Sequence, residues 1–207
     1  MSTDPAASAN EAPTPTRSDL LLKAAGAAGA LAGGGALLAA LPDAVGAAPS
    51  PKQDREILNL VLLMEEVQAR FYAEALRRGF LTGELEEFAR VVGAHERAHV
   101  AFLRRTLGSQ ARGRPTVEFD SLTSPASFTA TAIALEDLAV AAYNGQGPNL
   151  TKPTLAAAGK IVSVEARHAG WIRDIAGRNP APDATDPTLP AAAVMARLNR
   201  IADIKAR

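Results

Sequence analysis

Apolar residues recur every three or four positions along four long stretches of the chain, which is the spacing of an α-helix with one buried face. The pattern predicts helices over residues 51–78, 82–108, 125–144 and 151–176, and a shorter amphipathic helix over 191–205. Hydrophobic residues make up 47% of the chain and aromatic residues 4%, a balance that favours a helical core over a β-sandwich. The expected fold class is therefore all-α.

The lengths of the connections indicate how the helices are arranged. Only a few residues separate the first helix from the second, so these two should form an antiparallel hairpin. Residues 108–124 join the second helix to the third without a periodic apolar pattern, as in four-helix bundles with one long crossover. Ser50 is the expected N-cap of the first helix, with Gln53 closing a capping box. Residues 50–178 are expected to form the bundle, and 179–207 a proline-rich linker and a short C-terminal helix.

The first part of the chain has the composition of an export leader. Residues 1–16 are rich in Ser, Thr, Pro and Ala and are expected to be disordered. A basic start at Arg17, a Gly/Ala-rich apolar stretch and then small residues give the layout of a signal peptide. The stretch resembles twin-arginine signals, although Ser18 stands where a second arginine would be. Residues 1–48 are therefore expected to direct export to the periplasm, cell envelope or exterior. An uncleaved membrane anchor and a disordered tail are the alternatives.

Charge and cysteine content exclude several classes of function. The chain has 22 basic and 22 acidic residues, so it carries no net charge that would favour binding to nucleic acid. It contains no cysteine, which excludes disulfides, zinc–thiolate sites and iron–sulfur clusters.

Two Glu-x-x-His pairs are the strongest chemical signal of the chain. Residues i and i+3 of a helix share one face, so each pair aims a carboxylate and an imidazole at one point. Each pair is preceded by a further glutamate on the helix before it. This order is that of a di-iron or di-manganese carboxylate bundle. The candidate ligands for two Fe or Mn ions are Glu65, Glu96, His99, Glu136, Glu165 and His168.

The two tyrosines of the chain repeat the same duplicated pattern. Tyr72 follows Glu65, and Tyr143 follows Glu136, by seven residues in each case. Seven residues is nearly two helical turns, so each tyrosine shares the face of its glutamate. Both are candidate catalytic residues, acting as hydrogen-bond donors beside the site or as redox relays. The alternative is that each packs in the core with its hydroxyl satisfied elsewhere.

Neighbouring residues have simpler expected roles. Glu66 and Asp137 follow the proposed ligands but point about 100° away, so they are expected on solvated faces. His95 precedes Glu96 and is expected to be a surface or interhelix residue rather than a ligand. Four facing carboxylates would repel strongly without cations, which favours metal binding, and a salt-bridged core without metal is the alternative.

With these residues identified, the chain resembles the ferritin-like superfamily, in particular exported bacterial ferritin-like proteins grouped with desiccation-related proteins. The matching stretches are ILNLVLLMEEVQARFYAEAL, HERAHVAFLRRTLG, TATAIALEDLAVAAYNG and AAAGKIVSVEARHAGWIRDIAG. The resemblance implies a four-helix bundle with its long crossover between helices two and three. It also implies one metal held by Glu65, Glu96 and His99 and another by Glu136, Glu165 and His168, with Glu96 and Glu165 bridging. Gln68 departs from the pattern, since relatives often carry an acid there.

Three functions remain open at this level. The first is a di-metal oxidoreductase that reacts with O₂ or peroxide, and the lack of a built-in cysteine electron donor favours peroxide removal or ferroxidase-like turnover over oxygenase chemistry. The second is an iron-binding or storage protein, and the third a non-catalytic envelope stress protein. Metal ions are the expected partners. Contact with a membrane is expected only if the leader is not cleaved. Whether the protein forms a dimer is left open.

Overall fold

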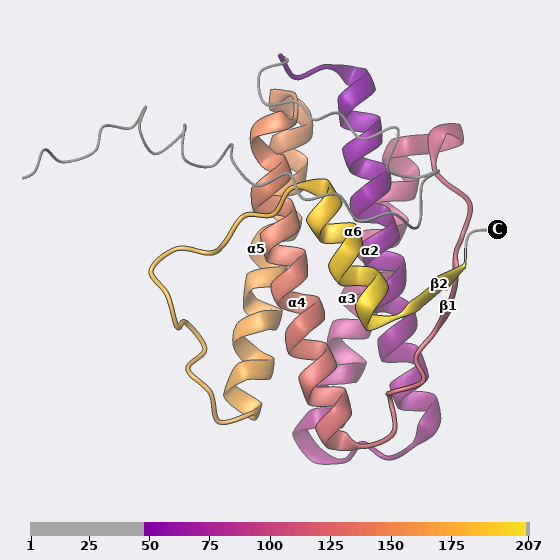
Figure 1. The fold of residues 1–207 in the computed structure, drawn as a ribbon, viewed down its shortest axis with the longest axis vertical. Helices are drawn as coiled ribbons and strands as arrows, with labels where there is room; N and C mark the ends of the chain where they lie inside the picture. Colours follow the sequence, from indigo (N-terminus) through magenta and orange to yellow (C-terminus); the bar gives the residue numbers. More distant parts are fainter. Residues whose placement is uncertain (1–47, 206–207) are drawn as a thin grey trace, which may run out of the picture. The chain divides into compact units, whose positions relative to one another are not determined.

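The computed structural model describes residues 48–205, and four long helices form a bundle in this part of the chain (Figure 1). The helices of the bundle are α2 (Pro51–Arg78), α3 (Gly83–Leu107), α4 (Pro125–Gln146) and α5 (Lys152–Ile175). A shorter helix, α6 (Ala191–Ile201), follows. The predicted all-α bundle with an additional C-terminal helix is confirmed. The predicted leader lies outside the described residues except for Ala48. None of the described helices is long and apolar enough to cross a membrane.

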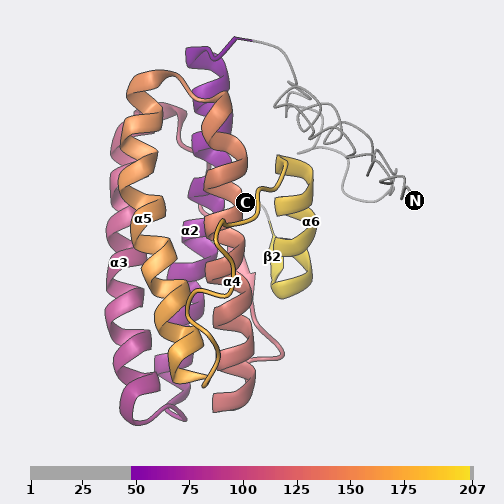
Figure 2. The same cartoon turned by 90° about the vertical axis from the view of Figure 1, so that its left-hand side faces the viewer.

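The helices pack as two hairpins. Helix α2 lies chiefly against α3, and α4 against α5, while α3 also meets α5 and α2 meets α4. Helix α6 packs on α4, on the side away from α3 and α5 (Figure 2). The duplicated sequence pattern therefore corresponds to two hairpins that face each other across one interior.

Serine caps set the starts of two bundle helices. The Ser50 side chain accepts the backbone N–H of Gln53 at 3.3 Å, as predicted. The Gln53 side chain is buried, however, and within the described residues it does not complete the reciprocal half of the predicted capping box. The complete box is at the start of α4, where Ser124 and Ser127 bond to each other's backbone. Helix α2 ends at Gly79, whose φ of 70° is the left-handed conformation typical of a glycine C-cap.

A buried carboxylate ties the start of α5 to α2. Asp54 accepts the backbone N–H of Thr151 at 2.9 Å and the hydroxyl of Thr154 at 2.5 Å. Burial alone would raise the pKa of Asp54, but the bonds from Thr151 and Thr154 outweigh it and lower the pKa below its ordinary 3.8. The negative charge of Asp54 also lies at the N-terminus of α5, where it interacts favourably with the helix dipole.

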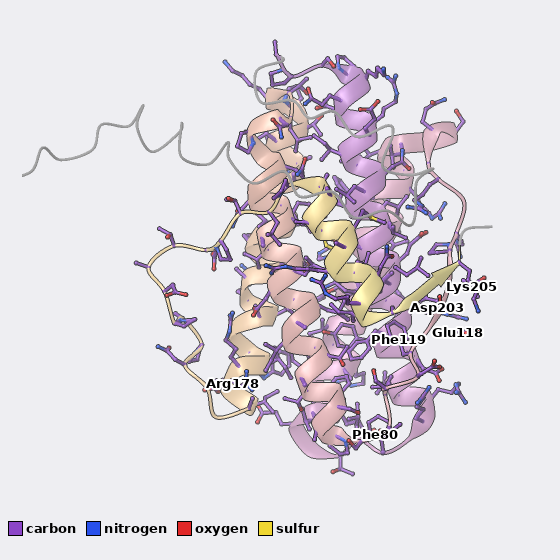
Figure 3. All side chains as sticks on the ribbon, viewed as in Figure 1. Phe80, Glu118, Phe119, Arg178, Asp203 and Lys205 are labelled. Atoms are coloured by element: carbon purple, nitrogen blue, oxygen red, sulfur yellow. The ribbon has the colours of Figure 1, made fainter. Side chains whose placement is uncertain are left out.

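The long crossover contains a short strand that the sequence did not predict. After a turn of 3-10 helix, η2 (Gly108–Gln110), the chain forms β1 (Thr116–Glu118), which pairs antiparallel with β2 (Asp203–Lys205). The prediction that the last helix reaches residue 205 is wrong, because the chain becomes extended after Ile201. Lys205 lies 3.3 Å from carboxylate oxygens of Glu118 and Asp203 (Figure 3). Three alternating residues in each strand are too few to give a periodic signal.

The segment before α6 docks closely on α4. The backbone N–H of Leu189 donates to the carbonyl of Ala141 at 3.0 Å. A Cβ at Gly145 would lie 2.1 Å from the Leu189 carbonyl oxygen, so this helix position requires glycine. Val194 and Leu198 of α6 are then fully buried. A second turn of 3-10 helix, η3 (Gly147–Asn149), leads from α4 to α5.

Candidate metal centre

One glutamate from each bundle helix points into the interior. Glu65 comes from α2, Glu96 from α3, Glu136 from α4 and Glu165 from α5, and all four have no exposed surface. Burying four carboxylates without compensation would cost several kcal/mol each, so their charge must be balanced by protons or cations. In α2, α3 and α5 the glutamate lies on the apolar, buried face, whereas α4 is buried on most sides, where it packs on α2, α5 and α6.

His99 of α3 approaches three of these carboxylates through a single ring nitrogen. Its Nδ1 lies 3.0 Å from Glu165, 3.2 Å from Glu65 and 3.3 Å from Glu96. The side chain is 12% exposed, so it lies at the edge of the cluster.

His168 of α5 makes the matching approach from the other hairpin. Its Nδ1 lies 3.2 Å from Glu96, 3.3 Å from Glu136 and 3.9 Å from Glu165. Both histidines therefore turn Nδ1 towards the carboxylates, which leaves each Nε2 directed away from them.

The six side chains form two overlapping groups, each with ligand atoms within 4.8 Å of one another. One group contains Glu65, Glu96, His99 and Glu165, and the other Glu96, Glu136, Glu165 and His168. The structure thus brings together all six residues that the sequence singled out. Glu96 and Glu165 belong to both groups, which is the placement that two bridging carboxylates require.

Each tyrosine hydroxyl donates to the glutamate of the opposite hairpin. Tyr143 donates to Glu65 at 2.7 Å, and Tyr72 donates to Glu136. Both tyrosines are buried, and the carboxylates that they contact help to raise their pKa well above the ordinary value, although burial is the larger cause. The sequence placed each tyrosine on the face of its own helix's glutamate. It could not show that the hydrogen bonds cross between hairpins.

Gln68 is a buried neighbour that the sequence did not assign to the site. Its Nε2 donates to Glu136 at 3.1 Å and to Glu165 at 3.5 Å. The side chain has no exposed surface. Gln68 therefore contributes a neutral donor where a second acid would have added another negative charge.

Burial and mutual repulsion raise the pKa values of two carboxyl groups. Burial, followed by the charge of Glu96, raises the pKa of Glu65 to about 8. Burial also raises the pKa of Glu136 to about 7, against the effect of its hydrogen bond with His168. Burial would lower the pKa values of both histidines, but hydrogen bonds to the surrounding glutamates raise them to about 12 for His99 and about 11 for His168. The metal-free cluster therefore holds protons that a cation would displace.

The expectation that Glu66 and Asp137 are solvated is wrong for Glu66. Glu66 is buried and pairs with Arg104 of α3. Asp137 pairs with Arg173 of α5 at 2.6 Å, and it is half-buried. The two ion pairs occupy matching positions of the two hairpins. The repeated spacing from each Glu-x-x-His pair to its arginine was the sequence signal that could have revealed them.

A pocket of 490 Å³ opens beside the two histidines, between α3 and α5. Its lining is His95, Ala98, His99, Val164, Arg167, His168 and Trp171. His95 is exposed, as expected, and it also bridges the two helices, since its Nδ1 lies 2.9 Å from Nε2 of His168. Burial, followed by the charge of His168, lowers the pKa of His95, which favours its neutral form.

The donor set fits iron or manganese. Carboxylate oxygens and imidazole nitrogens are suitable ligands for both metals. Buried oxygens of Glu96, Glu136 and Glu165 and Nδ1 of His168 face only other members of the cluster within the described residues. A cation lying among these atoms would balance the charge of the carboxylates.

Comparison with known proteins agrees with this description. The family model of the ferritin-like domain matches residues 53–178, which is most of the chain and contains all six cluster residues. A search of curated proteins gives no match.

Proposed function

The chain belongs to the ferritin-like domain family, and on that premise we propose that its buried cluster binds two iron or manganese ions for redox chemistry with O₂ or peroxide. The observation that carries the proposal is the pair of overlapping four-residue groups that share Glu96 and Glu165. Two positions with shared carboxylates suit two adjacent cations.

Charge balance supports two divalent ions. Four ionised glutamates supply four negative charges, and two divalent cations supply four positive ones. With a single cation, two of the carboxylates would still have to be balanced by protons, as they are in the metal-free cluster. When bound, such ions would supply one-electron redox changes and two adjacent positions for an O–O unit.

The protein's own residues hold the cluster in place around those positions. The hydroxyls of Tyr143 and Tyr72 orient Glu65 and Glu136 by donating to one oxygen of each. The second oxygen of each carboxylate is left facing a histidine. We propose that both tyrosines act as positioning donors for the glutamates that they contact.

The route for a small substrate is the pocket between α3 and α5. Its walls include the small side chains of Ala98 and Val164, together with both histidines. In the core beside the cluster, the rings of Phe71, Phe88 and Phe128 pack around Tyr72. O₂ or peroxide in this pocket would reach the cluster past His99 and His168, which line it.

The proposal is tested by a peroxide-consumption and O₂-consumption assay on the full chain after loading with Fe²⁺ or Mn²⁺. The expected result is turnover by the wild type that is lost in Glu136→Ala. Glu86→Ala, at an exposed position of α3, is the matched control and should keep full activity. Metal binding without turnover would contradict the oxidoreductase proposal. A large assembly holding many ions per chain would instead identify an iron-storage protein.

Export remains a proposal that rests on the sequence of residues 1–48. We propose that these residues carry the folded, metal-loaded protein out of the cytoplasm by the twin-arginine route. Cell fractionation tests it: Arg17→Ala should retain the protein in the cytoplasm, and undiminished export of this variant would contradict the proposed route.

A further inference from the structure

Each hairpin carries the same three-residue pattern, a Glu followed by a Glu-x-x-His pair, so the positions where the hairpins differ are informative. The residue directly before Glu96 is His95, whereas the residue directly before Glu165 is Val164. The third residue after Glu65 is Gln68, whereas the third after Glu136 is Ala139. In both cases the first hairpin has a polar side chain where the second has an apolar one.

Both additional polar side chains contact the same half of the cluster. Nδ1 of His95 lies 2.9 Å from Nε2 of His168, and the two rings stack with centroids 5.2 Å apart and planes 15° apart. Gln68 donates to Glu136 and Glu165. His95 thus contacts His168, and Gln68 contacts Glu136, and these two ligands belong only to the group of Glu96, Glu136, Glu165 and His168. At the equivalent positions of the other hairpin, Val164 and Ala139 have no polar side-chain atom.

The contact between the two histidines fixes one arrangement of protons. Nδ1 of His168 faces the carboxylates and must be free of a proton to bind a cation. The proton of a neutral His168 ring then lies on Nε2, which donates to Nδ1 of His95. Metal-binding histidines usually donate their second N–H to such an acceptor, which orients the ring and strengthens its binding to metal.

We propose that His95 is a positioning residue for His168, and that it makes the His168 half of the cluster the tighter of two unequal metal positions. This inference rests on the proposed di-metal function and adds to it an order of loading. The first ion enters the group of Glu96, Glu136, Glu165 and His168, and the second enters the group that contains Glu65 and His99. Removing a partner of this kind typically weakens metal binding about 10- to 100-fold.

The test is a titration of the metal-free full chain with Co²⁺, followed by visible absorption and by isothermal titration calorimetry. The wild type should bind two ions in two resolved steps. His95→Val gives the first hairpin the same type of residue as Val164 in the second, and it should weaken the tighter step about 10- to 100-fold while the other step changes little. His95→Asn can place an amide oxygen where Nδ1 stood, and it should restore the two-step curve.

Val164→Ala is the matched control, since it changes the equivalent position of the other hairpin and should leave both steps unchanged. Circular dichroism of each metal-free variant checks that it is folded. A wild type that binds no Co²⁺ would overturn both the proposed function and the inference. Two ions bound equally by the wild type, equal weakening of both steps in His95→Val, or failure of His95→Asn to restore the curve would overturn the inference alone.

Discussion

The crossed tyrosine bonds predict unequal effects for two chemically identical substitutions. Tyr143→Phe and Tyr72→Phe each remove one hydroxyl and leave the ring in place. Tyr143 donates to Glu65, and Tyr72 donates to Glu136. Glu136 keeps a second donor on the same oxygen, Gln68 at 3.1 Å, whereas no side-chain amide within residues 48–205 donates to Glu65.

The expected magnitudes follow from that difference. Leaving a buried acceptor without its hydrogen-bond donor costs about 1–3 kcal/mol. Tyr143→Phe should therefore lower the free energy of unfolding by about 1–3 kcal/mol. Tyr72→Phe should cost about 0.5–1.5 kcal/mol, because Gln68 still satisfies the same oxygen. The double variant Tyr72→Phe/Gln68→Leu should cost more than the sum of its two single variants, since the residues share one acceptor.

Urea unfolding of the metal-free full chain, monitored by circular dichroism in the presence of a chelator, measures these costs. The dependence of the free energy on urea should be the same in all variants, so that midpoints can be compared directly. A cost for Tyr72→Phe equal to or greater than that for Tyr143→Phe would refute the reasoning. So would strict additivity in the double variant.

Three further substitutions test other parts of the structure. Asp54→Ala should cost about 1–3 kcal/mol at neutral pH. Because the pKa of Asp54 is lowered from 3.8, this contribution is present above that pH and is lost as the pH falls through the folded pKa, so acid titration of stability should show the two proteins converging. Gly145→Ala should undock the segment before α6 and speed tryptic cleavage after Arg197 and Arg200 of α6, whereas Gly159→Ala, with open space around it, should not. Glu66→Ala should destabilise the fold by about 1–3 kcal/mol through its partner Arg104 yet leave Co²⁺ stoichiometry unchanged, and loss of metal would show that Glu66 belongs to the cluster.

The helices could be predicted because their signals are local and long. Apolar periodicity over more than twenty residues, with Ser50 and Ser124 at helix starts, determines both the type of element and its approximate limits. The pairing of β1 with β2 could not be predicted in the same way. It joins three residues near position 117 to three near position 204, and such a short, distant contact leaves no periodic pattern.

The cluster could be predicted because helical spacing fixes which residues share a face. The Glu-x-x-His pairs point inward as that spacing requires. What the spacing could not provide was the partner of each polar group across the bundle. The donation of Tyr143 to Glu65, the burial of Glu66 and the insertion of Gln68 all depend on how two hairpins face each other. The metal-binding role of the six cluster residues stays a prediction.

Elemental analysis of the purified full chain tests whether the six cluster side chains hold two cations. The protein should be expressed with both iron and manganese in the medium, beside Glu165→Ala, which removes a carboxylate common to both groups. We predict about two metal ions per wild-type chain and a large loss in the variant. Less than about a tenth of an equivalent of either metal in the wild type, or full occupancy in Glu165→Ala, would contradict the claim.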